Sequence, residues 1–243
     1  MSTDRALAIA KRVVKQIVRD RRSLALIFLA PLLVMTLVGQ SFRNQSAVLD
    51  RIAPALVAVF ALFFTFLLTG VSFLRERSQG TLERLLTTPV GRGDILVGYL
   101  LGFLLFATIQ SIVVLLYTVF ALNVHYQGNL AQVFVLLMVL TIASVSMGIF
   151  IATFARNEFQ VVQFIPVVLA PQIFVSGVFL PVSQMPRILQ LFSDVMPLRY
   201  AVEGLRAIML QGQNLGDVLN DLAALAAFAI VMLAAAAATV RRT

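Results

Sequence analysis

The residues with the greatest capacity for specific chemistry gather in one polar stretch, residues 75–94, RERSQGTLERLLTTPVGRGD. Thr81 can cap a helix, Glu83 in its first turn suits the positive end of the helix dipole, and Pro89 ends the pattern. The predicted helix has about two turns, and one face carries Leu82, Leu85 and Leu86. So short a helix is marginal alone in water, and its leucine face requires a covering surface. That surface could be lipid, the protein's own helices or another protein. We favour docking on another protein, and the alternative is an ordinary solvated helix.

Side chains suited to catalysis are scarce elsewhere. The only lysines, Lys11 and Lys15, do not end the glycine-rich string of a P-loop, so no ATPase site is expected on this chain. Cysteine is absent, and the single histidine, His125, has no companions at metal-ligand spacing. Hydroxyl and amide side chains inside the apolar runs lack an accompanying base, so we expect most of them to hydrogen-bond between helices; a place along a substrate path is the alternative for some. The sequence predicts no catalytic, metal-binding or cofactor-binding residue, and therefore no enzyme.

The elements that position the polar stretch are long apolar runs. Sixty per cent of the 243 residues are hydrophobic and only 12% are charged, which is typical of a chain embedded in a bilayer. Runs without Asp, Glu, Lys or Arg, near the roughly 20 residues that a spanning helix needs, cover residues 24–40, 52–74, 95–122, 130–155, 159–181 and 222–240. Their continuous apolar character excludes a transmembrane β-barrel. We predict an all-α integral membrane protein with six transmembrane helices in a single domain, residues 1–243.

The distribution of basic residues predicts the orientation of these spans. Alternate connections carry 14 and 5 Lys and Arg residues, and the richer set marks the cytoplasmic side. Both termini and residues 75–94 are therefore expected in the cytoplasm, with the chain in the plasma (inner) membrane as a multi-pass protein. The same asymmetry accounts for the net charge of +8, so nucleic-acid binding is not expected.

The N-terminal segment, residues 1–22, is an amphipathic helix by its pattern. Apolar residues recur at helical spacing, with basic residues largely opposite them. Such a helix lies on the inner leaflet, with its apolar face in the membrane lipid and its basic face toward anionic headgroups. It can also border a cytoplasmic partner.

The longest external segment, residues 182–217, has the pattern of two short helices, broken at Pro197 and ending at Gly212. On the second helix, a charged ladder follows one face: Arg199, Glu203 and Arg206. Pro166, Pro171 and Gly177 in the preceding span favour bending, although such residues are common in membrane helices. Within the third span, Gly98-x-x-x-Gly102 is a helix-packing motif.

The polar stretch also carries a family resemblance. Arg75-Glu76-Arg77, then Gly80-Thr81-Leu82-Glu83, and then Leu85-Leu86 up to Pro89 resemble the signature of ABC-2-type transporter permeases, with a leaning toward the drug-exporter branch. Residues 155–160 resemble the family's second cytoplasmic loop, and Ser176-Gly177 with Phe179-Leu180-Pro181 resembles its exit-side end. The number of spans, the inner termini and the large outer loop match as well, so the resemblance covers essentially the whole chain.

Site residues follow from this resemblance. It implies that a cytoplasmic coupling helix within residues 75–94 docks on an ATPase through Glu76, Gly80, Thr81, Leu82, Glu83, Leu85, Leu86 and Pro89. The resemblance assigns Arg156, Asn157 and Glu158 to the second cytoplasmic loop. The outer helices would be re-entrant and close an exit gate formed by Pro171, Gly177, Pro181, Arg199, Glu203 and Arg206. A pair of helices resting on the outer surface with a solvated ladder is the alternative.

The resemblance further implies a permease subunit of an ATP-driven ABC exporter. Two copies of a separate ATP-binding subunit would carry ATP and Mg, and a second permease chain, identical or paralogous, would complete the transporter. Apolar spans suit a lipophilic or amphipathic cargo. The alternative is a stand-alone secondary transporter or channel, but the apolar runs lack the acidic and basic residues that commonly couple protons or cations.

Overall fold

The computed structural model describes residues 3–81, 85, 87 and 90–240, and these residues form helices, turns and loops without a strand. In chain order the elements are α1 (Thr3–Arg19), α2 (Arg21–Ser41), α3 (Ser46–Ser78), α5 (Arg92–Leu116), the π-helix η1 (Tyr117–Ala121), α6 (Leu130–Ala152), α7 (Glu158–Val175), the 3₁₀ turn η2 (Val182–Gln184), α8 (Arg187–Ser193), α9 (Pro197–Gln211) and α10 (Leu219–Val240). Six of the described helices are long and apolar enough to cross a membrane, which confirms the predicted all-α membrane fold: α2, α3, α5 with η1, α6, α7 and α10.

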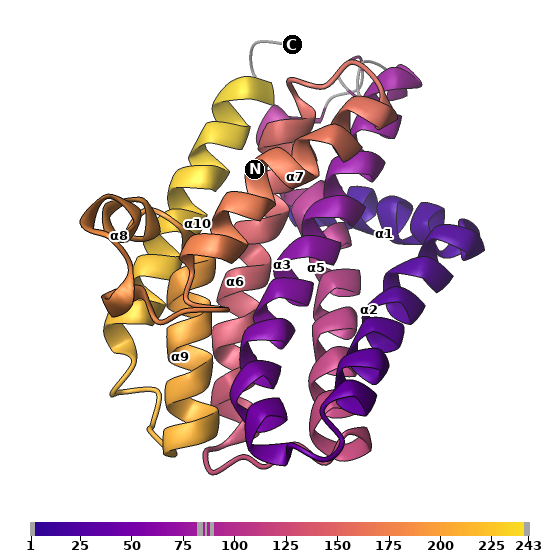
Figure 1. Ribbon diagram of the computed structural model, residues 1–243. Coiled ribbons are helices and arrows are strands. Elements are labelled where there is room, and N and C mark those ends of the chain that lie inside the picture. Colours follow the sequence, from indigo (N-terminus) through magenta and orange to yellow (C-terminus); the bar gives the residue numbers. More distant parts are fainter. Residues whose placement is uncertain (1–2, 82–84, 86, 88–89, 241–243) are drawn as a thin grey trace.

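The bundle has two ends, which we name by their connections (Figure 1). The proximal end holds the C-terminus of α3 and the start of α7. The distal end holds the loops at residues 42–45 and 122–129. The end of α10 lies at the proximal end (Figure 1).

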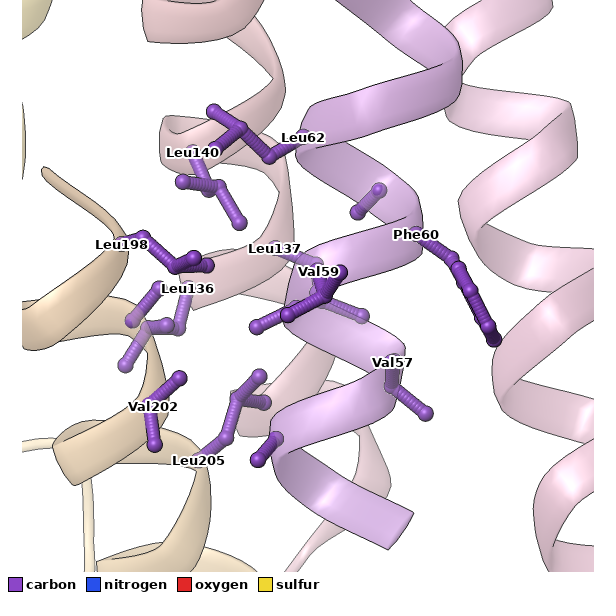
Figure 2. Close-up of a cluster of buried hydrophobic side chains, with 14 of the residues drawn as sticks. Val57, Val59, Phe60, Leu62, Leu136, Leu137, Leu140, Leu198, Val202 and Leu205 are labelled. Carbon is purple, nitrogen blue, oxygen red and sulfur yellow. The ribbon is translucent and has the colours of Figure 1, made fainter. Parts of the chain in front are cut away.

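Helix α3 is the central element of the bundle, packed against α5, α6, α7 and α9 (Figure 1). Its most apolar window is 78% buried, compared with 17% for α2 and α10. Figure 2 shows Leu62 of α3 near Leu140 of α6, with Val202 of α9 facing the same cluster. Continuous apolar character lets all sides of α3 be buried at once, whereas α2 and α10 expose most of their surface.

Two spans, α3 and α7, differ from the predicted limits by more than three residues. Helix α3 has 33 residues and extends beyond the apolar run 52–74 at both ends, so that Arg75 and Arg77 belong to its last turn. Helix α7 runs through Pro166 and Pro171 but ends at Val175, before the predicted limit of 181. It ends there because Gly177 has φ +83°, a left-handed conformation that an α-helix cannot contain.

The N-terminal helix is amphipathic as predicted, and α5 covers part of its apolar face, while Leu7 of the same pattern is 58% exposed. Ile9 and Val13 are buried against α5, where Gly98 and Gly102 let the two helices approach closely. A Cβ atom added at Gly98 would lie 2.6 Å from the Ile9 Cβ. The glycine motif of the third span is therefore occupied within the chain, by α1.

The segment before the last span forms the two short helices that the pattern predicted. Helix α9 begins with Pro197 at its first turn and is capped by Gly212, which has φ +66°. One face of α9 is completely buried and includes Leu198, Val202 and Leu205. Because α9 packs against α3, α6 and α10 (Figure 1), it lies within the bundle and does not rest on the bundle's surface.

Candidate functional site

The predicted coupling stretch, residues 75–94, begins within the last turn of α3, which ends at Ser78. Gly80 has φ +68°, a conformation that reverses the chain and that favours glycine. Thr81 and Leu85 are helical, whereas four of the predicted coupling residues lie outside the described residues: Leu82, Glu83, Leu86 and Pro89. Leu85 packs against the proximal hydrophobic core that includes Phe73 and Ile95. Of the three surfaces that could cover the leucine face, the protein's own bundle thus covers Leu85.

Glu76 is an internal anchor. Only 3% of this residue is exposed, and its carboxylate accepts a hydrogen bond from the Tyr99 hydroxyl at 2.8 Å. The same carboxylate oxygen forms a salt bridge with the Arg12 guanidinium of α1. Burying a carboxylate is costly unless it is paired and hydrogen-bonded, and here both conditions are met. Glu76 therefore ties the end of α3 to α1 and α5.

Arg75, the preceding residue, links two other elements. Its Nη1 donates to Asp20 Oδ2 at 2.9 Å, in the corner between α1 and α2. Its Nε and Nη2 donate to the two carboxylate oxygens of Glu158 at 3.0 and 3.3 Å, at the start of α7. Hydrogen bonds from Ser23, followed by the interaction with Arg75, lower the pKa of Asp20 from its ordinary value. Asp20 thus remains a carboxylate that both caps α2 and holds Arg75.

The second cytoplasmic loop joins the same assembly. Asn157 caps α7 by accepting a hydrogen bond from the Gln160 backbone at 2.8 Å, and Glu158 pairs with Arg75. The Arg156 backbone N–H donates to Gln160 Oε1 at 2.8 Å, which closes the loop. From α3, Arg77 donates to the Thr153 carbonyl at 2.7 Å. The structure therefore brings the loop against the end of α3, a contact that the resemblance did not predict.

The contacts within this assembly leave no pattern in the sequence. We call the assembly the proximal network: Arg12, Asp20, Arg75, Glu76, Arg77, Tyr99, Thr153 and Glu158. Arg75 and Arg77 stood inside the recognised motif, but nothing in the motif indicated what they bind. A weak signal existed at Asp20, because an acidic residue placed before Ser23 is typical of a helix N-cap.

Most of the predicted gate residues meet beside the turn after α7. Gly177, Pro181, Arg199, Glu203 and Arg206 line one cavity of about 430 Å³, which we call the exit cavity. Pro171 does not line it and lies within α7.

The charged ladder on α9 is bonded within the chain. Arg199 forms a salt bridge with Asp194 and a second with Glu203, in which Nε lies 3.3 Å from Oε1. Arg206 donates to the Gly177 carbonyl at 2.6 Å and to the Val178 carbonyl at 3.1 Å. Because the Arg199 side chain is only 21% exposed, the ladder is not the fully solvated face of the alternative interpretation. It fastens α9 to α8 and to the turn after α7.

Polar groups inside the bundle bond both to neighbouring helices and to their own helix, as Thr141 and Ser146 do by donating to the Leu137 and Ile142 carbonyls. Ser144 of α6 donates to the Leu62 carbonyl of α3 at 2.7 Å, and the hydroxyls of Ser111 and Thr141 lie 3.4 Å apart. His125 pairs with Asp50, with 3.2 Å between Nδ1 and Oδ2. In the part of the chain that the structure describes, no three His, Cys, Asp or Glu residues gather in a way that could hold a metal ion.

Comparison with known proteins agrees with this geometry. The profile of the family described as ABC-2 type transporter matches residues 5–210. The chain is 31% identical over 171 residues to ABC transporter G family member 20 of Dictyostelium discoideum, covering 70% of this chain and 23% of that protein. It is 29% identical to the probable multidrug ABC transporter permease YbhR of Escherichia coli (70% and 46% covered) and to the linearmycin resistance permease protein LnrN of Bacillus subtilis (80% and 51%).

The aligned region spans about half the length of the two bacterial relatives and less of the Dictyostelium protein. The family match nevertheless covers most of this chain, from α1 through α9. The six spanning helices, the polar stretch after α3 and the two helices before the last span all lie in or next to the matched region. The chain therefore belongs to the ABC-2 type transporter family.

Proposed function

We propose that this chain is the membrane permease of an ATP-driven exporter, worked by a separate ATP-binding subunit. The observation that carries the proposal is the proximal network, which ties the end of α3 to α1, α5, α6 and α7 at the start of the predicted coupling stretch. A force on residues 80–89 would act on all of these helices together. A single solvated helix end would not transmit force in this way.

The mechanism that we infer is mechanical. Closure of the ATP-binding subunits displaces the coupling stretch, and α3 carries the displacement along its length of about 50 Å. The far part of α3 packs against α9, where Val59 of α3 and Val202 of α9 belong to one cluster (Figure 2). Movement of α3 would thereby shift α9 and reshape the exit cavity. The protein would alternate between two packed arrangements whose populations the ATP-binding subunits change.

The proposed complex contains two ATP-binding subunits, which bind ATP and Mg, and a second permease chain, identical or paralogous. The basic asymmetry of the loops supports a plasma-membrane location with the proximal end in the cytoplasm. Two relatives are named for multidrug transport and for linearmycin resistance, which supports export of a lipophilic or amphipathic cargo. Apolar spans with few ionisable residues suit such a cargo.

Purification from the native membrane in mild detergent, followed by mass spectrometry of the bound proteins, tests the coupling. We expect a P-loop ATPase in stoichiometric amount, lost from Glu83→Arg and retained by Asp4→Arg, a matched charge reversal at an exposed position of α1. Leu85 is a poorer choice because it packs on the protein's own core, so that its replacement would disturb folding as well as docking. Recovery without any ATPase after crosslinking in the membrane would contradict the proposal and favour a stand-alone channel or carrier. ATP-driven uptake would contradict the direction.

A further inference from the structure

A second distal cavity adjoins the exit cavity but differs from it in charge. It measures about 560 Å³ and lies between the first turns of α3 and the turn after α7. Its walls include two arginines and several apolar side chains, namely Arg51, Arg206, Val48, Ile52, Phe179 and Leu180. No carboxylate is among its described lining residues, whereas Asp194 and Glu203 line the exit cavity.

The two arginines are close enough for their charges to interact. Burial, together with the charge of Arg51, lowers the pKa of Arg206, while Glu203 opposes the change. An arginine nevertheless stays protonated at any physiological pH. The cavity thus concentrates two positive charges at one site, an arrangement that favours an anion.

Nearby acidic groups are engaged by other partners. Asp50, the chain neighbour of Arg51, accepts a hydrogen bond from the His125 backbone at 2.9 Å and pairs with the His125 ring. Asp194 and Glu203 both pair with Arg199. Within the described residues, Arg51 has no ion-pair partner.

Arg206 is held in position rather than neutralised. Its Nη1 and Nη2 donate to the carbonyls of Gly177 and Val178, and its buried Nε has no hydrogen-bond partner. Carbonyl groups satisfy two of the donors without supplying a full negative charge. The guanidinium is therefore positioned in advance at the cavity wall.

The remaining walls present an apolar surface beside these charges. Phe179 is 71% exposed and Leu180 is 44% exposed, and Val48 lies across the cavity at the start of α3. Inorganic phosphate has no apolar surface to bury, so such walls add nothing to its binding free energy. An anionic amphiphile has two favourable contributions to its binding free energy: its acyl chain buries apolar surface, and its headgroup binds the arginines.

We propose that the cavity between Arg51 and Arg206 binds the negatively charged headgroup of a membrane phospholipid from the leaflet at the distal end. The phosphate oxygens accept hydrogen bonds from the guanidinium of Arg51, which forms no other ion pair, and lie in the field of Arg206. The acyl chains follow Phe179 and Leu180 into the bilayer. This site does not depend on coupling to an ATPase, and it can be tested on the isolated chain.

The test uses the purified full chain in phosphatidylcholine nanodiscs that contain a small fraction of photoreactive phosphatidylglycerol. Crosslinked peptides are mapped by mass spectrometry. We expect labelling near residues 48–52 and 179–180, competed by unlabelled phosphatidylglycerol but not by additional phosphatidylcholine. Arg51→Gln should lower labelling about fivefold, as expected for loss of one partly exposed ion pair.

Two control variants make the result specific. Arg51→Lys keeps the charge and should retain labelling within about twofold of wild type. Arg43→Gln removes an exposed arginine that lines a different distal cavity and should leave labelling unchanged. Arg206 is not chosen because it also holds the turn after α7.

Three outcomes would overturn the proposal. Equal labelling of wild type and Arg51→Gln would show that Arg51 does not bind the headgroup. Equal competition by phosphatidylcholine would show that no anionic headgroup is selected. Competition by inorganic phosphate as strong as that by phosphatidylglycerol would assign the cavity to a small anion and not to a lipid.

Discussion

The two ends of the bundle use their charged residues in different ways. At the proximal end, charges from separate helices pair with one another, as Arg12 does with Glu76 and as Arg75 does with Asp20. At the distal end, Arg199 pairs within neighbouring turns and Arg206 binds backbone carbonyls of the turn after α7. Pairing between helices ties the ends of α1, α3 and α7 together at the proximal end. Asp50 and His125 also pair there across distant parts of the chain, but among the described residues none of these ion pairs includes Arg51.

The largest effect should come from breaking the proximal network at its most buried member. Glu76→Ala leaves the Tyr99 hydroxyl buried without its partner and frees Arg12 from its ion pair. We expect a loss of about 2–3 kcal/mol in the free energy of unfolding, because one partner of a largely buried pair is removed. Thermal unfolding in detergent measures this loss.

Glu76→Gln is the matched variant for that measurement. Its amide oxygen can still accept from Tyr99, although it cannot pair with the Arg12 charge. It should therefore lie between wild type and Glu76→Ala. A melting temperature for Glu76→Ala equal to that of wild type would mean that the buried carboxylate does not hold α1 and α5 to α3.

The next effect concerns the contact between α1 and α5. In Gly98→Ala the new Cβ would meet the Ile9 Cβ at 2.6 Å and the Ala6 carbonyl oxygen at 2.8 Å. Overpacking of this kind costs about 2 kcal/mol, and here the cost can be relieved by detaching α1. Limited trypsin digestion should then cleave faster at Lys11 and Lys15. Gly216→Ala is the control, because a Cβ there meets nothing within 4 Å; equal cleavage rates in the two variants would argue against the packing.

The smallest effect on the free energy of unfolding is expected at Gly177, in the turn after α7. Gly177→Ala forces an alanine to adopt φ +83°, although its Cβ would meet no atom closer than 3.5 Å. The cost is therefore conformational, about 1 kcal/mol. A melting-temperature shift as large as that of Glu76→Ala would show that the two ends do not differ in the way described.

Much of the fold was predictable because its signals are local. Continuous apolar runs indicated the spanning helices, and Pro197 and Gly212 marked α9, since a proline suits the first turn of a helix and a glycine its left-handed cap. The predicted boundaries of α3 and α7 were less accurate than those of the other spans. Helix α3 continues through polar residues because Glu76 finds partners on α1 and α5, which no local pattern reveals.

The candidate sites were predictable as residues but not as contacts. The motif located Glu76 and Glu158, yet their roles as an internal anchor and as the partner of Arg75 emerged only in the structure. The coupling assignments of Leu82, Glu83, Leu86 and Pro89 stay predictions, because these residues lie outside the described part of the chain. Pro171 was grouped with the gate residues but does not line the exit cavity.

By itself, the sequence determined that this chain is a bundle of membrane-spanning helices with a polar stretch after α3, because hydrophobicity and helix capping act within a few residues. Only the tertiary structure decided which charges meet. Arg12 and Glu76 are 64 positions apart, and Arg75 and Asp20 are 55 apart. Such pairs form only after α1, α2 and α3 have packed, since a salt bridge depends on the distance between side chains in space and not on their separation along the chain.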